Sequence, residues 1–264
     1  MIQTLKTAVS LLSILVLFAA GCGIKPQPVQ RSISADEAVR RITMQNENIL
    51  DFTGSATVTT RSENGSGEKF GLTIKYMKPD RFRFMVKGFA GLPLAVITLK
   101  ADSLIAYFPQ DNSYIKSASG AKVISRLVPG LNLDISKLTS FLTGILPDNE
   151  VADFQKSIIV DGGTSVLMLK KEPFEHVLTL SGEHFDLIEE RFLFAGETSW
   201  LRTASAYRDF DDGIRFPRTI TMERAGDMIS FDFSRREFNT GLKSDKLIFT
   251  VPFSAEKLSI PGLE

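Results

Sequence analysis

Apolar and polar side chains alternate with a period of two between Lys69 and Lys87. The apolar positions of this stretch are Phe70, Leu72, Ile74, Tyr76, Phe82, Phe84 and Val86. This alternation predicts strands that bury one face, because successive side chains of a strand point to opposite sides of the sheet. Lys78-Pro79-Asp80 divides the stretch and predicts a tight turn between two such strands.

Short turn motifs rich in Gly, Asn and Asp recur along the chain. They are Asn64-Gly65, Asp111-Asn112, Asp161-Gly162-Gly163, Ala195-Gly196, Asp212-Gly213 and Ala225-Gly226. Such turns join neighbouring antiparallel strands, so the pattern predicts a mainly β protein built as an antiparallel meander. We expect about ten or eleven strands, a number that favours a curved sheet forming an incomplete, half-open barrel.

One helix is expected before the first strand. Ser34-Ala35-Asp36-Glu37 is a capping-box motif, in which the Ser hydroxyl and the Glu carboxylate bind backbone N–H groups of the first turn. The apolar residues that follow have roughly helical spacing: Ala38, Val39, Ile42 and Ile49. The pattern predicts an N-terminal helix of about 13 residues.

A second helical region interrupts the strands between residues 121 and 149. Asp134 has the chemistry of a helix N-cap, and the helix that it predicts ends at Gly144–Pro147. Its apolar residues are Leu138, Phe141, Leu142 and Ile145. We interpret this segment as a helical lid over one opening of the curved sheet.

The N-terminal residues have the organisation of a secretory signal peptide. Lys6 is followed by an apolar run from Ala8 to Ala20, which is too short to be a stable membrane span. Ala19-Ala20-Gly21-Cys22 then resembles the bacterial lipobox, in which the cysteine thiol accepts diacylglycerol and becomes the mature N-terminus. The alternative is that Cys22 is an ordinary small buried residue. Because it is the only cysteine, an internal disulfide is excluded.

These features predict three parts of the chain. Residues 1–21 form the signal peptide, residues 22–33 form a lipidated tether with Pro26 and Pro28, and residues 34–264 form one lipid-binding domain. In enteric bacteria an Asp after the lipidated cysteine retains a lipoprotein in the inner membrane, and Gly23 stands at that place here. We therefore expect an anchor in the outer membrane, with the domain on the periplasmic face.

Charge gives little support to a nucleic-acid partner. The chain has 31 Lys and Arg against 31 Asp and Glu, and Lys6 is the one charged residue of the signal peptide, which leaves about one net negative charge after cleavage. No basic patch of the kind that binds nucleic acid is present in the sequence. Phe is the dominant aromatic residue, with 20 against four Tyr and one Trp. Phe has no polar atom that requires a partner, so a Phe-rich sheet face is either a plain core or a cavity for acyl chains.

The sequence contains no persuasive catalytic set. HExxH, CxxC, GxSxG and glycine-rich phosphate-loop motifs are missing. We expect His176 and His184 to be surface or hydrogen-bonded histidines. Asp209, Asp211 and Asp212 have carboxylates suited to Ca²⁺, but the following Gly213 favours a solvated hairpin turn. We therefore expect neither an enzyme nor a resident metal or cofactor.

The loop Gly88–Pro93 carries two large apolar side chains, Phe89 and Leu92, among Gly and Pro residues. Loops of this kind lie at the surface, where exposed apolar side chains indicate contact with a membrane or a partner. The alternative is that both side chains fold back onto the rim of the sheet.

Several segments resemble the outer-membrane lipoprotein-sorting family, LolA/LolB-like, and especially its lipid-anchored receptor LolB. They are Lys78–Phe84, Gly88–Leu92, Leu131–Leu138, Phe141–Pro147 and Phe216–Ile220, and the likeness extends from Asp51 to Pro252. The resemblance implies an incomplete antiparallel barrel with a helical lid. It also implies a cavity that receives the acyl chains of a lipoprotein from a LolA-like periplasmic carrier, without covalent chemistry.

The leading hypothesis is therefore a monomeric, lipid-anchored outer-membrane lipoprotein that binds acyl chains and assists lipoprotein localisation or insertion. Its expected partners are acyl chains of lipoproteins or other amphiphiles, a LolA-like carrier and the outer membrane. One alternative is a structural or scaffold lipoprotein of an envelope complex with a filled core. Another is a carrier of a different lipid or glycolipid.

Overall fold

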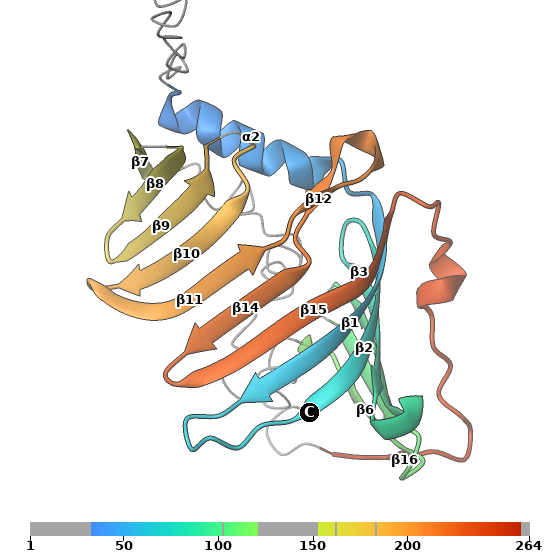
Figure 1. Ribbon diagram of the computed structural model, residues 1–264. Coiled ribbons are helices and arrows are strands. Elements are labelled where there is room, and N and C mark those ends of the chain that lie inside the picture. Colours follow the sequence, from blue (N-terminus) through green and yellow to red (C-terminus); the bar gives the residue numbers. More distant parts are fainter. Residues whose placement is uncertain (1–32, 102, 121–152, 162, 183, 260–264) are drawn as a thin grey trace, which may run out of the picture. The chain divides into compact units, whose positions relative to one another are not determined.

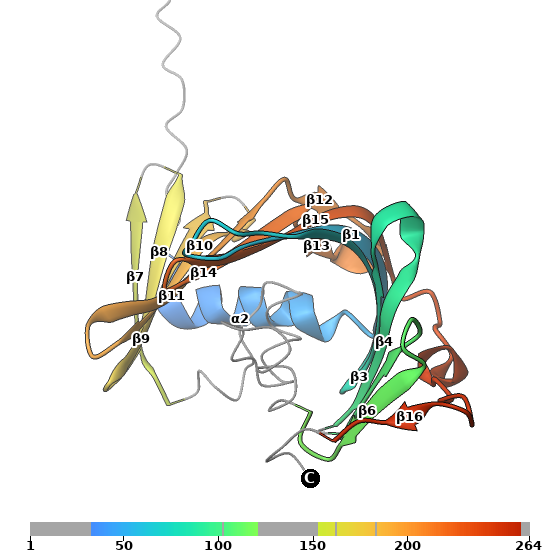
Figure 2. The same ribbon diagram turned by 90° about the horizontal axis from the view of Figure 1, so that it is seen from below.

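The computed structural model describes residues 33–101, 103–120, 153–161, 163–182 and 184–259. Most of them lie in one sheet of 14 strands, in the order β16-β6-β5-β4-β3-β2-β1-β15-β14-β11-β10-β9-β8-β7. The sheet curves strongly, and its first and last strands do not pair with each other within the described residues (Figures 1 and 2). The predicted mainly β, half-open barrel is confirmed. The predicted signal peptide, Cys22 and the lid residues Leu138, Phe141, Leu142 and Ile145 lie outside the described residues.

The first part of the sheet is a meander of six strands. These are β1 (Asp51–Arg61), β2 (Lys69–Met77), β3 (Arg81–Lys87), β4 (Pro93–Lys100), β5 (Ser103–Phe108) and β6 (Ser113–Ser117). The 3-10 turn η1 (Phe89–Gly91) joins β3 to β4. Lys78-Pro79-Asp80 joins β2 to β3, as the sequence predicts.

The second part continues with strands from the C-terminal half of the chain. These are β7 (Gln155–Asp161), β8 (Thr164–Lys171), β9 (Phe174–Ser181), β10 (Leu187–Phe194), β11 (Glu197–Ser205), β14 (Thr219–Arg224) and β15 (Asp227–Phe238). A separate two-stranded hairpin consists of β12 (Arg208–Asp209), η2 (Asp211–Gly213) and β13 (Arg215–Phe216). After η3 (Ser244–Leu247), β16 (Glu256–Lys257) pairs in parallel with β6. The expected strand number was too low, partly because β12, β13 and β16 are only two residues long.

One helix, α2 (Ala35–Glu47), has 13 residues, as predicted. The Ser34 hydroxyl accepts a hydrogen bond from the Glu37 backbone N–H at 3.2 Å, which confirms half of the capping box. The other half is wrong: the Glu37 carboxylate accepts hydrogen bonds from Arg40 and Arg41 one turn later. Ile49 lies beyond the helix and is buried in the sheet core. In Figure 2, α2 lies inside the curve of the sheet.

The central pair of strands joins the two parts of the chain. β1 pairs with β2 on one side and with β15 on the other, so the sheet is continuous from β16 to β7. The Asp51 carboxylate at the start of β1 accepts hydrogen bonds from the backbone N–H groups of Thr240, Gly241 and Leu242. Residues 239–258, here named the C-terminal strap, then run along the outside of the curve beside β4 and β6 (Figure 2). Among the described residues, no helix combines the length and the apolar character needed to cross a bilayer.

Candidate functional site

The seven apolar positions predicted on β2 and β3 share one face of the sheet. Tyr76 lies opposite Phe82, Ile74 opposite Phe84, and Leu72 opposite Val86 in the antiparallel register. The rings of Tyr76 and Phe82 are 4.7 Å apart, and those of Phe82 and Phe84 are 5.7 Å apart. This face continues through β1, β14 and β15 by the cross-strand neighbours Val58, Phe231 and Ile220. We name it the concave wall.

Burial divides these seven residues into two groups. Leu72, Ile74, Tyr76 and Phe82 are buried, whereas Phe70, Phe84 and Val86 are half-buried and pack against the buried group. The half-buried side chains keep apolar surface that a further apolar group can cover. Their placement on one face is established, while the role of acyl-chain contact stays a prediction.

Helix α2 covers a different part of the same wall. Its residues Ala38, Val39 and Ile42 pack in one cluster with side chains of β8 and β9, and all of them are buried. The strand residues of this cluster are Leu167, Leu169, Leu178 and Leu180. Because each exposes at most 1% of its surface, this part of the wall is a filled core.

An aromatic row follows on the concave wall next to the part under α2. Phe192 stacks on Trp200 with ring centres 5.6 Å apart, and Phe174 contacts Phe192 and Phe194. Phe174 is 40% exposed and Phe194 is 51% exposed. This row was not predicted from the sequence, although Phe192 and Phe194 show the same spacing of two as the apolar residues of β2 and β3.

A buried ionic cluster lies between the two apolar parts of the wall. Glu190 on β10 is fully buried and pairs with Arg202 on β11 and with His176 Nδ1 at 3.0 Å. Arg202 lies opposite Met222, which packs with the apolar residues of β1–β3 and β15, and Glu190 lies opposite Leu178 of the cluster under α2. His176 is therefore hydrogen-bonded, one of the two situations expected for it, and His184 is exposed.

Two opposing effects set the ionisation of Glu190. Burial alone raises the pKa of a carboxyl group, but the charges and hydrogen bonds of Arg202 and His176 outweigh it here. The pKa of Glu190 is therefore below its ordinary value, and the side chain is an anion at neutral pH. A carboxylate held in this way is not a proton donor near neutrality, so we assign the cluster a structural role.

The turn between β3 and β4 carries the predicted exposed residues. Phe89 is 96% exposed and Leu92 is 61% exposed, so the alternative that both fold back onto the rim is wrong. Ala90 and Gly91 have positive φ angles of 56° and 77°, and the Gly88 N–H donates to the Leu92 carbonyl at 2.8 Å. This closed turn presents Phe89 to the surroundings. Whether it contacts a membrane stays a prediction.

The acidic cluster before Gly213 forms a turn, as expected. Asp211–Gly213 is η2, the Asp209 carboxylate pairs with Arg215, and Asp212 accepts a hydrogen bond from Asn239 at 2.8 Å. The described residues contain no group of three or more His, Cys, Asp or Glu side chains arranged to hold a metal ion.

Comparisons with solved structures find a similar fold in proteins of very different sequence. A LolA superfamily protein from Nitrosomonas europaea matches with a TM-score of 0.54 and 14% identity, over 83% of this chain and 99% of that one. A putative outer-membrane lipoprotein-sorting protein domain from Vibrio parahaemolyticus matches with a TM-score of 0.57 and 13% identity, over 81% and 97%.

A DUF1329 family protein from Desulfovibrio piger is similar to the same degree, with a TM-score of 0.57 and 12% identity, over 82% of this chain and 100% of that one. No family model and no curated protein matches the sequence. At these identities the likeness establishes the fold and leaves the activity open. The closer resemblance to the receptor LolB stays a prediction.

Proposed function

We propose that this protein is a lipid-anchored envelope lipoprotein that binds acyl chains of lipoproteins or related amphiphiles against its concave wall, without covalent chemistry. The observation that carries the proposal is the apolar part of the concave wall on β1–β3, β14 and β15, with half-buried Phe70, Phe84 and Val86, on a sheet that stays open. The fold shared with a lipoprotein-sorting domain supports it.

The energetics of acyl transfer explain why such a wall is useful. Each CH₂ group exposed to water costs about 0.8 kcal/mol, so a chain of about 16 carbons costs on the order of 10 kcal/mol. A protein that accepts this chain must offer apolar surface of comparable extent. Phe and Val side chains do this without a polar atom that would need a partner.

Binding is tested with the mature chain in which Cys22→Ser removes the protein's own lipid. We expect this chain to bind a fluorescent fatty acid and to take an acylated lipoprotein from a carrier. Trp200 is the single tryptophan and belongs to the aromatic row, so a brominated fatty acid that reaches this row quenches its fluorescence. Failure to bind either acyl probe would refute the proposal.

A matched pair of variants on β3 separates binding from folding. Phe84 and Met85 are neighbours, both half-buried, and they point to opposite faces of the sheet. We expect Phe84→Ala to weaken acyl binding about tenfold, because a phenyl ring contributes at least that much when covered. Met85→Ala should leave binding within about twofold, since it loses no contact on the concave wall.

We also propose that Cys22 carries the lipid anchor, that the anchor lies in the outer membrane, and that Phe89 and Leu92 contact the bilayer during delivery. Metabolic labelling with palmitate and membrane fractionation test the first two points against Cys22→Ser. Phe89→Asp and Leu92→Asp should block delivery and leave uptake intact. Normal delivery by both variants would contradict the role of the turn.

A scaffold lipoprotein of an envelope complex is the second candidate. The filled core between α2 and β8–β9 favours it, because that part of the wall has no room for a guest. This candidate predicts that Phe84→Ala lowers the free energy of unfolding. It also predicts no acyl binding to the concave wall in either the parent chain or the variant.

A further inference from the structure

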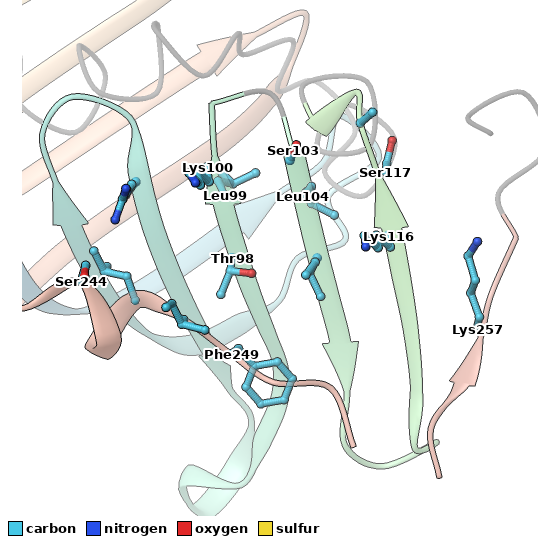
Figure 3. Close-up of a pocket in the computed structure, with 15 residues that line it drawn as sticks. Thr98, Leu99, Lys100, Ser103, Leu104, Lys116, Ser117, Ser244, Phe249 and Lys257 are labelled. Carbon is cyan, nitrogen blue, oxygen red and sulfur yellow. The ribbon is translucent and has the colours of Figure 1, made fainter. Parts of the chain in front are cut away.

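A groove lies on the outer side of the sheet, away from the concave wall. It has a volume of about 640 Å³ and is bounded by β4, β5, β6, the C-terminal strap and Arg81 of β3. In Figure 3 the strap passes in front of the strands at Phe249 and returns beside β6 at Lys257, so that it frames the groove on two sides. The volume is in the range of sites that hold small organic ligands.

The frame is held by specific contacts. Arg83 donates from Nη1 to the carbonyl oxygens of Lys246 and Ile248 at 3.2 and 3.3 Å. Phe249 stacks on Tyr107 with ring centres 5.1 Å apart. The pairing of β16 with β6 fixes the far side. The groove is therefore a built feature of the described chain.

Its charge is strongly one-sided. Arg81, Lys100, Lys116 and Lys257 line it, and the described lining residues include no Asp or Glu. Within the described residues, none of these four has an ion-pair partner, whereas Lys156, Lys170 and Lys171 each pair with a carboxylate.

The strand register places two positive charges opposite each other, and a bound anion would reduce their repulsion. Arg81 lies directly opposite Lys100 on the antiparallel pair β3–β4. Like charges at directly opposed positions destabilise a sheet, and an anion between them removes the repulsion. Ser103 and Ser244 in the lining add hydroxyl groups able to donate to the same anion.

Most of the remaining lining is apolar. Ile105, Ile248 and Phe249 provide hydrocarbon surface beside the cations, and Ile248 is 64% exposed. Cations and hydroxyls next to an apolar surface match a phosphate ester that continues into an acyl chain. A free phosphate ion would leave the apolar part uncovered, and an acidic peptide would bring carboxylates with no matching hydrocarbon.

We propose that this outer groove binds one anionic phospholipid, with its phosphate between Arg81, Lys100 and Lys116 and the start of its acyl chains over Ile248 and Phe249. The site is distinct from the concave wall, since it lies on the other face of the sheet. It is also distinct from the exposed turn, because Arg81 begins β3 and Phe89 follows its other end.

The test uses the mature chain with Cys22→Ser and a short-chain, water-soluble phosphatidylglycerol, measured by titration calorimetry. We expect phosphatidylglycerol to bind. Phosphatidylcholine of the same chain length and inorganic phosphate should each bind at least about tenfold more weakly. Lys100→Gln with Lys116→Gln should weaken phosphatidylglycerol binding by about tenfold or more, because charge-assisted hydrogen bonds are lost.

Two controls make the result specific. Lys170→Gln with Lys171→Gln removes the same net charge from paired lysines elsewhere and should change the affinity by less than about twofold. Ile248→Ser keeps every charge but should weaken binding severalfold. Phe84→Ala on the concave wall should have no effect, so failure here and failure of the proposed acyl binding are separable.

Three results would overturn the proposal. Equal affinity for phosphatidylglycerol and phosphatidylcholine removes the role of the phosphate charge. An equal loss in the paired-lysine control assigns the effect to net charge alone. Equal affinity for inorganic phosphate or for an acidic peptide removes the lipid as the occupant.

Discussion

Two parts of the concave wall, one on β2 and β3 and the other under α2, cover their apolar side chains to different extents. On β2 and β3 the wall is wholly apolar, and its outer members Phe84 and Val86 remain half-buried. On β8 and β9 the wall is buried under α2, and the ion pair Glu190–Arg202 lies at the border of this part. The part on β2 and β3 keeps apolar surface that is still uncovered, whereas the part under α2 is filled by internal packing.

This difference assigns different roles to the two parts. A buried ion pair seldom adds net stability over an apolar pair of the same size, yet it fixes the partners of each strand because a shifted register would leave a charge unpaired. We therefore expect β8 and β9 with α2, bordered by the ion pair, to act as the rigid support, and β2–β3 to be a surface that accepts a guest.

The largest effect is expected where the ion pair is broken. Glu190→Ala leaves Arg202 buried without its carboxylate and should destabilise the fold by about 3–5 kcal/mol. Chemical denaturation measures the change. Glu190→Leu combined with Arg202→Met should recover most of the loss, because the charge and its partner leave together. The exposed pair Arg218–Asp232 is the control, and Arg218→Ala should cost less than about 1 kcal/mol.

The next effect compares core substitutions in the two parts. Leu178→Ala creates a cavity under α2 and should cost about 2–5 kcal/mol. Val86→Ala removes methyl groups that are half-buried and should cost less than about 1 kcal/mol. Equal costs in denaturation experiments would mean that both parts are filled cores, and the distinction between support and guest surface would fail.

Lowering the pH should reduce the free energy of unfolding through the buried ion pair Glu190–Arg202. Because the pKa of Glu190 is lowered in the fold, its contribution is present above the ordinary carboxyl pKa and is lost as the pH falls through the lowered value. We expect the wild type to lose more unfolding free energy between about pH 5 and pH 3 than the Glu190→Leu, Arg202→Met variant. Glu37, whose pKa is lowered to about 2 by Arg40 and Arg41, is common to both proteins and cancels in the comparison. Identical pH profiles would contradict this assignment.

The smallest effect is expected at the tip of the β3–β4 turn. Phe89 makes almost no contact with the rest of the protein, so Phe89→Ser should change the unfolding free energy by no more than about 0.5 kcal/mol. A thermal or chemical denaturation curve checks this. A larger loss would indicate that the side chain supports the guest surface from outside.

The regular strands were predictable because their alternation is local. Phe70 to Tyr76 and Phe82 to Val86 each show a period of two, and the register places their side chains on one face as expected. The helix was equally predictable, because Ser34 and the apolar spacing that follows it are local features of the sequence. These features need no knowledge of distant contacts.

The ionic cluster was not predictable from the same pattern. β10 carries register shifts between Leu187 and Glu189 and between Phe192 and Leu193, and these bulges change which side chains point inward. Sequence alone therefore could not show that Glu190 is buried while its neighbour Glu189 is not. The outer groove was not predicted for another reason: Arg81, Lys116 and Lys257 come from three segments distant in sequence, which the sheet and the strap bring together.

The position of β1 has a consequence for the order in which the chain folds. The hydrogen bond between Asp51 and Asn239 joins residues 188 apart, and the β1–β15 pairing spans nearly the same distance. Contacts this remote in sequence form slowly, so a newly made chain presents the unpaired edge of β1 and its apolar face until β15 is available. A chain built in this way is prone to aggregate through the edge of β1 until β15 has paired with it.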